Sequence, residues 1–423
     1  MSTLQNHKKT HTSWITVLVI VMILSFPRSF SLYRAIFIGL LISISWLIDY
    51  RPIRETKLRL PILFFYGCIS SLGIAWTIIG SFNGASAFAV SDYLRLYVLW
   101  SFFYIILLHW ILLNGDFIAI HMAVVASSIL IPSINLVGMA DSYYQLDIFS
   151  SYIRDEMEMK IVFYDGGYTS FASHNVGSLF FIIPYLITYS IIKKTNNKKD
   201  YLLTIGLLLS FAFALASGRR ALWIVIAAQP IIIFLLTSLS NISIDYRSIL
   251  KRSIKLLCAA IVISIYNLDW ITSIDLDIIS EYAKMIFLTN DERIVQSPFL
   301  IDGFLKNPIW GSGYGVNAVY TRNSERPWIY ELTYHQLLFN MGIIGTLSLV
   351  SLLTVYIRSS IMKIKKYTTI RHYGCSIMVG IASFALGAYS NPYFGSFDFL
   401  LIVALVPLIT AYKEGEVSFE LEA

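Results

Sequence analysis

The residues best suited to chemistry are a histidine and three arginines that stand near the ends of apolar runs. His335 opens a long apolar run after a polar segment, and an imidazole can accept a proton from a hydroxyl group at neutral pH. Arg219 and Arg220 form a short turn between two apolar runs, and Arg293 lies in a long polar segment. A guanidinium stays charged and binds phosphate oxygens through two N–H groups at once. The set predicts a base beside an anion site.

Each of these residues also has a simpler explanation. An arginine at a membrane boundary can extend its charge to the lipid headgroups, although Arg219 and Arg220 have no acidic residue close by in the sequence. His335 can be an interfacial residue whose ring bonds to water or backbone. Glu331 stands four residues before it, a spacing that on one helix places both on the same face, where the carboxylate would orient the ring. We predict His335 and Glu331 as catalytic residues.

Membrane spans must position these side chains. Of the 423 residues, 57% are hydrophobic and only 14% are charged, more apolar surface than a soluble core hides. Apolar runs of about 18 residues or more are typical of helices that cross a bilayer. We predict an all-α polytopic membrane protein with a single domain, 1–423, and about twelve spans. They lie near 14–27, 33–48, 60–82, 92–113, 117–138, 171–192, 201–216, 221–238, 250–266, 328–357, 373–390 and 396–412.

The basic residues set the direction of these spans. With the N-terminus inside, the inner segments hold most of the 32 lysines and arginines, so the positive-inside rule predicts that both termini are cytoplasmic. Two long segments, 139–170 and 267–327, then face outward, and the second is expected to contain amphipathic helices at the interface. The net charge of +6 reflects this orientation and requires no nucleic-acid partner.

Several other polar residues are weaker candidates. Arg95 lies about one turn inside a span from the outer face, where a cation needs a partner such as a phosphate. His174 and Asn175 could contact a polar ligand, or could simply begin a helix at the interface. Asp275 and Asp277 have a spacing that can hold a divalent metal, but we interpret them as solvated loop acids. Because no His/Cys/Glu cluster has metal-ligand spacing, we predict neither a metal nor a cofactor.

The segment before His335 resembles the conserved region of the bacterial O-antigen ligase and O-antigen polymerase family. Members show an arginine, an Asn-Pro, a Gly-x-Gly and, after a polar stretch, a histidine that leads into a helix with Gly-x-x-Gly. The matching residues here are Arg293, Asn307-Pro308, Gly311-Ser312-Gly313, His335-Gln336 and Gly342-Ile343-Ile344-Gly345. "LASGRRALW" at 215–223 and "FASHNVGSLFFIIPYL" at 171–186 are similar to two further family segments. Gln336 departs from the asparagine that is common at that place.

The resemblance implies a GT-C-like helical fold and a metal-independent inverting glycosyltransferase at the outer face of the bacterial inner membrane. Its donor would be an oligosaccharide linked to a polyprenyl diphosphate, and membrane lipid and a chain-length regulator protein are expected partners. By the same resemblance, His335 is the base that activates the acceptor hydroxyl. Arg219, Arg220 and Arg293 would hold the diphosphate, with Arg95 as a further donor contact.

Polymerase and ligase differ in the acceptor, which is another lipid-linked repeat unit or the lipid A–core. Both long outer segments carry an arginine followed by a glycine, Arg154 to Gly166 and Arg293 to Gly303. This resembles a pairing described for O-antigen polymerases, so we favour a polymerase and include Arg154, His174 and Asn175 as glycan contacts. A lipid-glycan flippase or transporter is the competing class, but nearly charge-free spans and long outer segments count against it.

Overall fold

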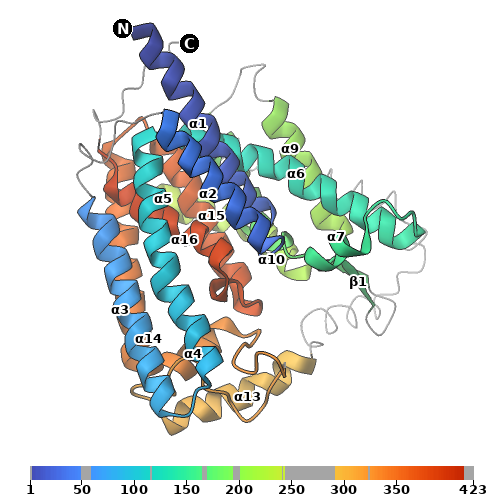
Figure 1. Cartoon of the computed structure of the whole chain (residues 1–423), viewed down its shortest axis with the longest axis vertical. Helices are drawn as coiled ribbons and strands as arrows, with labels where there is room; N and C mark the ends of the chain where they lie inside the picture. Colours follow the sequence, from blue (N-terminus) through green and yellow to red (C-terminus); the bar gives the residue numbers. More distant parts are fainter. Residues whose placement is uncertain are drawn as a thin grey trace.

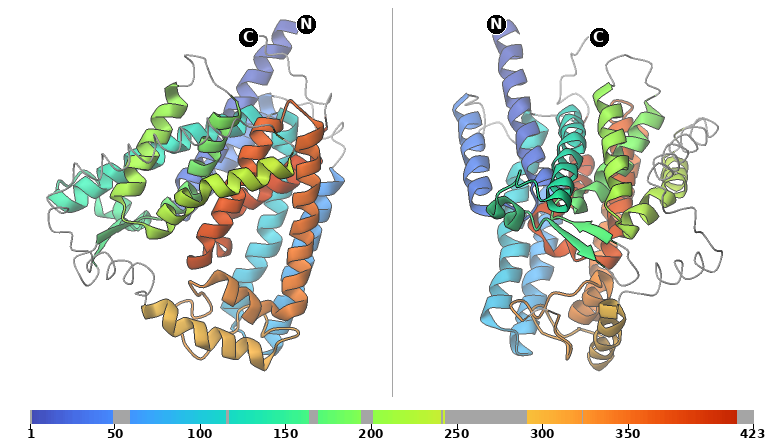
Figure 2. Two further views of the ribbon diagram at one scale, coloured as in Figure 1. Left: turned by 180° about the vertical axis from the view of Figure 1, so that it is seen from behind. Right: turned by 90° about the vertical axis from the view of Figure 1, so that its right-hand side faces the viewer.

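The computed structural model describes residues 2–48, 59–114, 117–163, 169–193, 201–240, 242, 291–322 and 324–413. These residues form a bundle of helices with one small β-hairpin at its side (Figures 1 and 2). The elements of the first half are α1 (Ser2–Ser25), α2 (Ser31–Ile48), α3 (Leu60–Phe82), α4 (Ala87–Leu94), the π-helical turn η1 (Arg95–Leu99), α5 (Trp100–Asn114), α6 (Phe117–Tyr144), α7 (Ser151–Glu156), β1 (Lys160–Phe163) and β2 (Thr169–Ala172). The second half contains α8 (Val176–Ile192), α9 (Tyr201–Ala216), α10 (Arg220–Leu239), α13 (Asp291–Lys306), α14 (Thr333–Lys366), α15 (Arg371–Gly387), the 3-10 turns η4 (Ala388–Ser390) and η5 (Tyr393–Gly395), and α16 (Phe397–Ala411).

Five stretches of helix in the described part are long and apolar enough to cross a membrane. They are α3, the continuous run Ala87–Leu112, α6, α10 and α14. Shorter apolar helices occupy Trp14–Ser25, Ser31–Leu41, Val176–Ile192, Tyr201–Ala216 and Phe397–Ala411. The prediction of a mostly helical chain with apolar spans is therefore confirmed. Each predicted span that falls on described residues overlaps a helix, whereas the predicted span 250–266 lies outside them.

Helix α8 lies in the core of the bundle because it is apolar on every face. All of its residues from Val176 to Tyr189 are buried, and it packs against α15, α6, α9 and α10. Glycines on α15 permit this close approach, since a Cβ at Gly380 would collide with the ring of Phe181. This buried helix begins at Val176, directly after His174 and Asn175.

Segment 139–170, predicted to face outward, is more structured in its described part than the sequence predicts. Helix α6 continues to Tyr144, α7 follows, and β1 pairs antiparallel with β2 from Lys160 opposite Ala172 to Phe163 opposite Thr169. The prediction of one helical span over 171–192 is wrong at its start, because this stretch begins in β2 and α8 begins only at Val176. A short apolar run suits a strand as well as a helix, and here hairpin pairing decides between them.

Segment 267–327, predicted to face outward, contains one helix within its described part. Helix α13 lies across the end of the bundle opposite the beginning of α1 (Figure 1). One of its faces, with Gln296 and Leu300, is buried, and the helix packs against α14. The opposite face exposes Ile294, Ile301 and Leu305. This packing fixes Arg293, near the first turn of α13, against the bundle.

Helix α14 is broken at Gly342, which has a φ of 59° and a ψ of −166°. A break leaves backbone groups of the helix without their usual partners, and buried groups of this kind need new ones. The preceding loop supplies them. The N–H of Ser312 donates to the carbonyl oxygen of Phe339 at 2.8 Å, and the N–H of Gly313 donates to that of Asn340 at 2.9 Å.

The glycine motifs make this contact possible. A Cβ on Gly311 would collide with the Asn340 carbonyl group, a Cβ on Gly313 would collide with the backbone of Gly80, and a Cβ on Gly342 would collide with the backbone of Gly311. Their positive φ angles also suit glycine. The Gly-x-Gly loop and the helix break therefore lock together, and they fix the short first segment of α14 that carries His335.

Candidate functional site

The connection between α15 and α16 links the parts of the molecule that carry the predicted site. We call residues 388–396 the site loop. The first turn of α14 is bonded to it, since Thr333 Oγ1 donates to the carbonyl oxygen of Asn391 at 2.8 Å. The hydroxyl of Tyr334 donates to the carbonyl oxygen of Ala385, just before the loop, at 2.5 Å. His335 therefore lies beside the site loop.

Tyr393 of the site loop is the point at which charges from distant segments meet. Burial raises the pKa of its phenol, the positive charges of Arg219, Arg28 and Arg293 lower it, and the negative charge of Glu331 raises it. The charges of Arg219 and Arg293, predicted from separate segments, therefore act on one side chain of the site loop.

Glu331 does not lie where the sequence predicts. Helix α14 begins at Thr333, so Glu331 precedes the helix and does not share its face with His335. Its two carboxylate oxygens bind Arg293 Nε and Arg322 Nη2, each at 2.8 Å. The prediction of a helical Glu331–His335 pair is therefore wrong, because the helix starts after the glutamate. Glu331 instead connects α13 to the loop before α14.

His335 faces the site loop from the first turn of α14. The centroid of its imidazole lies 6.5 Å from that of the Tyr389 ring. Its Nδ1 is buried and has no hydrogen-bond partner among the described residues. Buried polar atoms are nearly always bonded, so this nitrogen is a candidate to accept a bond from a substrate. The simpler explanation of this histidine was a ring that bonds to water or backbone. No backbone partner of Nδ1 is found in the described part of the chain.

Arg219, in the turn between α9 and α10, is held by a hydrogen bond to an uncharged backbone oxygen. Gly218 adopts a φ of 62°, and Arg219 follows it as the residue that caps α10. The Nε of Arg219 donates to the carbonyl oxygen of Phe171 in β2 at 3.0 Å. No carboxylate pairs with Arg219 within the described ranges, so its charge is not offset by a direct ion pair. Arg220, the first residue of α10, is half-buried.

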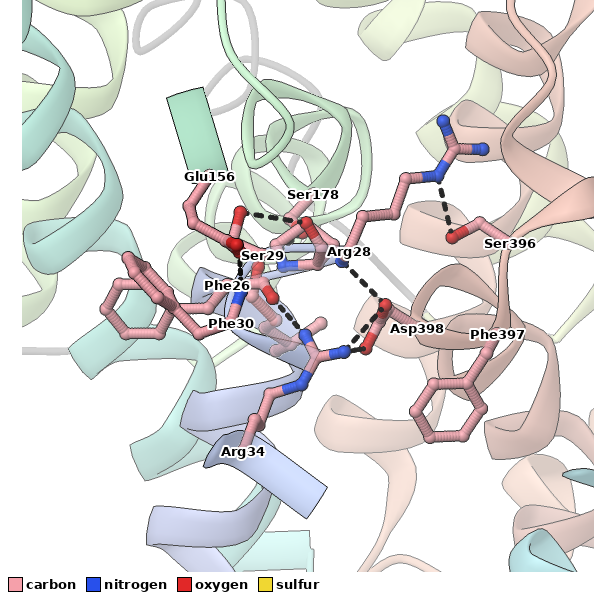
Figure 3. A network of polar contacts seen from close by, with 12 residues as sticks. Phe26, Arg28, Ser29, Phe30, Arg34, Glu156, Ser178, Ser396, Phe397 and Asp398 are labelled. Carbon is pink, nitrogen blue, oxygen red and sulfur yellow. Dashed lines mark hydrogen bonds and ion pairs between the residues drawn. The ribbon is translucent and has the colours of Figure 1, made fainter. Parts of the chain in front are cut away.

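The sequence analysis missed Arg28, in the connection 26–30 between α1 and α2. Its side chain is solvent-exposed, yet burial by the surrounding protein lowers its pKa, while the charges of Glu158, Asp398 and Tyr393 raise it. Its Nε donates to Ser396 Oγ in the site loop at 3.1 Å (Figure 3). A signal for it was present in the sequence. In the predicted orientation Arg28 lies in an outer turn, where the positive-inside rule makes arginine uncommon.

Arg95 is paired within its own helical run. Its Nη2 lies 2.5 Å from Asp92 Oδ1, and the side chain is 53% exposed. The same carboxylate lies 3.9 Å from the Nε of Arg326, a second arginine that the sequence analysis missed. The charge of Arg326 lowers the pKa of Arg28, so Arg326 acts on a residue bonded to the site loop. Arg95, in contrast, is bonded to Asp92 of its own helical run.

Arg154 is compensated by carboxylates within segment 139–170. Its Nη2 lies 3.1 Å from Asp147 Oδ1 and its Nε lies 3.8 Å from Asp141 Oδ2. Its Nε also donates to the carbonyl oxygen of Phe149 at 3.1 Å. These contacts brace the turn between α6 and α7 and leave little positive charge for a glycan. Gly166, its predicted counterpart, lies outside the described residues.

His174 and Asn175 have different surroundings although they are neighbours. Burial lowers the pKa of His174, with Glu158 raising it and Arg28 lowering it, so His174 lies near the Arg28 side of the site. Asn175 is fully buried. Its Oδ1 accepts bonds from Asn135 Nδ2 at 2.7 Å and from Ser173 Oγ at 2.9 Å. Asn175 therefore joins α6 to the start of α8 inside the bundle and offers no surface to a glycan.

No group of three His, Cys, Asp or Glu side chains within the described ranges could hold a metal ion, and Asp275 and Asp277 lie outside those ranges. No protein-family model and no curated protein matches the chain.

Proposed function

We propose that this protein polymerises a bacterial surface polysaccharide of the O-antigen type. It would lie in the inner membrane with both termini in the cytoplasm and about twelve GT-C-like spans. At the outer face, it would transfer a glycan from a polyprenyl diphosphate to a sugar hydroxyl of another lipid-linked repeat unit. The proposal rests on the resemblance of the sequence together with the site geometry.

One observation carries the proposal most directly. Arg219 and Arg293 come from distant parts of the chain, yet both charges act on Tyr393 in the site loop. His335 adjoins the same loop and has a buried Nδ1 without a described partner. An anion site next to a proton acceptor is what the reaction needs, because the leaving group is a diphosphate and the nucleophile is a hydroxyl group.

The reaction follows from these positions. His335 accepts the proton of the acceptor hydroxyl as its oxygen attacks the anomeric carbon and inverts it. The bond from that carbon to the diphosphate oxygen breaks, and the electron pair leaves with the polyprenyl diphosphate. Arg219, Arg220 and Arg293 stabilise the negative charge that develops on this leaving group.

Glu331 has a supporting role in this proposal. It holds Arg293 and Arg322 at 2.8 Å each, so one carboxylate fixes the direction of two guanidinium groups. Because two positive charges share one negative charge, this set retains a net positive charge. In this proposal Glu331 does not orient the His335 ring.

Deletion of the gene tests the proposal. A polymerase defect should leave lipid A–core that carries one repeat unit only, seen as loss of the ladder on a polysaccharide gel. Bare core with polymer accumulating on the polyprenyl carrier would indicate a ligase instead. A normal ladder would remove both activities and favour a transporter.

A further inference from the structure

We propose that Arg28 is a further ligand of the donor headgroup, and that it makes the site select a diphosphate over a monophosphate. This inference rests on the proposed function for the class of donor, a polyprenyl-linked anion. It adds a segment that the resemblance does not include, the connection between the first two helices.

The carboxylates of Glu158 and Asp398 act on Arg28, and another arginine neutralises Asp398. Asp398 is 3% exposed and lies 2.9 Å from the Nη2 of Arg34. Arg28 reaches the same carboxylate only with its backbone N–H, at 2.8 Å. Its guanidinium turns away from Asp398 toward Ser396 (Figure 3). No described carboxylate lies within 4.0 Å of that guanidinium, which bonds instead to a hydroxyl group and, at 3.5 Å, to the carbonyl oxygen of Pro392.

The backbone that presents Arg28 is strained and firmly held. Arg28 has a φ of 64° and Phe30 a φ of 50°, a left-handed conformation that side chains with a Cβ rarely adopt. The N–H groups of both residues donate to carboxylates, that of Arg28 to Asp398 and that of Phe30 to Glu156 at 2.7 Å. Strain of this kind persists where the surroundings determine the conformation, and it is common at ligand sites. Here it fixes the direction of one cation.

Arg28 is bonded to the site loop, on which the predicted phosphate ligands also act. Its Nε donates to Ser396 Oγ at 3.1 Å, and the charges of Arg28, Arg219 and Arg293 all lower the pKa of Tyr393 in the same loop. The three guanidinium groups come from three separate segments of the chain. A diphosphate presents oxygens on two phosphorus atoms, whereas a monophosphate presents them on one. A third fixed cation therefore favours the larger headgroup.

Binding of defined headgroups to the full-length protein in nanodiscs tests this inference. The probes are a polyprenyl diphosphate and a polyprenyl monophosphate of equal chain length, with inorganic pyrophosphate as a competitor. Wild type should bind the diphosphate more tightly. Arg28→Ala should weaken diphosphate binding about tenfold or more, as expected for lost bonds between charged groups, and should change monophosphate binding much less. Arg28→Lys should restore affinity in part, because the ammonium keeps the charge and loses the fork.

Lys306→Ala is the matched control, since it also removes one positive charge, from the exposed end of α13 where Lys306 pairs with Asp302. It should bind both lipids like wild type. Inorganic pyrophosphate should displace the lipid diphosphate from wild type and displace it less effectively from Arg28→Ala, which shows that the headgroup is what Arg28 recognises. An unchanged diphosphate-to-monophosphate ratio in well-folded Arg28→Ala, or no preference in wild type, would overturn the inference even if polymerisation is intact. Normal selectivity in a protein that forms no polymer would instead contradict the proposed function alone.

Discussion

Two pairs of arginines near the site loop are held in different ways. Arg293 and Arg322 share the carboxylate of Glu331. Arg28 and Arg219 are held by a hydroxyl group and backbone carbonyl oxygens. We call the first pair the compensated side and the second pair the uncompensated side. A carboxylate offsets part of the positive charge, whereas a neutral oxygen orients the guanidinium and leaves its charge unchanged.

This difference suggests a division of roles. An anion is attracted most strongly by cations that have no carboxylate partner, so the donor headgroup should depend mainly on the uncompensated side. His335 belongs to α14, next to the compensated side, where the acceptor hydroxyl would lose its proton. Variants on the two sides should therefore change different steps.

The comparison requires first that both sides face the same compartment. In a cysteine-free background, single cysteines at Ser150 and Ser324 should react with an impermeant thiol reagent in intact spheroplasts. A cysteine at Thr368 should react only after the membrane is permeabilised, because the basic segment around it is predicted to lie inside. All three positions are exposed on the protein. Opposite labelling of Ser150 and Ser324 would separate the two sides and end the comparison.

Removal of the base should have the largest effect on rate. His335→Ala should lower turnover about 10²–10⁴-fold, which is typical for loss of a general base, while leaving donor binding near the wild-type level. The measurement is in vitro turnover with a defined lipid-linked substrate, beside a donor-binding assay on protein that elutes normally in gel filtration. Near-normal turnover would show that His335 is only an interfacial residue.

Single arginine variants compare the two sides directly. Arg219→Ala should weaken donor binding about tenfold or more, because it removes charge-assisted bonds to phosphate. Arg322→Ala should weaken binding less, because the carboxylate of Glu331 already offsets part of its charge. Donor dissociation constants at one salt concentration give the comparison. Equal losses in the two variants would mean that the carboxylate does not divide the site.

The smallest expected effect comes from neutralising the compensated side. Glu331→Gln keeps the size of the side chain and removes one negative charge, so donor affinity should rise about twofold to fivefold at low salt, the scale of a partly exposed ion pair. The gain should shrink as salt is raised, because salt screens the added field. Weaker binding in Glu331→Gln would show instead that the ion pairs are needed to hold Arg293 in place.

Much of the fold could be predicted from apolar run lengths. The predicted spans 60–82 and 201–216 agree with α3 (Leu60–Phe82) and α9 (Tyr201–Ala216), because a helix that is apolar along its whole length ends where the polar residues begin. The start of α8 could not be predicted in this way. Phe171 and Ala172 are apolar, but they pair with β1 in a hairpin, and their apolar character alone does not distinguish a strand from a helix.

The site was predictable only in part for a related reason. Arg219 and Arg293 were found from their charge and their place outside the apolar runs. Glu331 was misplaced because a spacing of four residues implies a shared face only if both residues lie in one helix, and α14 begins between them. Arg28 was missed although the same charge argument applies to it, because its partners Ser396 and Asp398 belong to the far end of the sequence.

The sequence by itself determined that this chain forms a bundle of apolar helices. Hydrophobic residues make up 57% of it and lie in long runs, and helices of this kind are shielded from water by lipid and by one another. It also determined which charged residues stand between the runs. Only the tertiary structure decided which of their charges remain available. Arg34 is neutralised by Asp398 and Arg293 is bound to Glu331, whereas the side chains of Arg28 and Arg219 bond to neutral oxygens within the described residues. An ion pair forms over a few ångströms between segments that are distant in sequence, so compensation of charge is a property of the packed bundle.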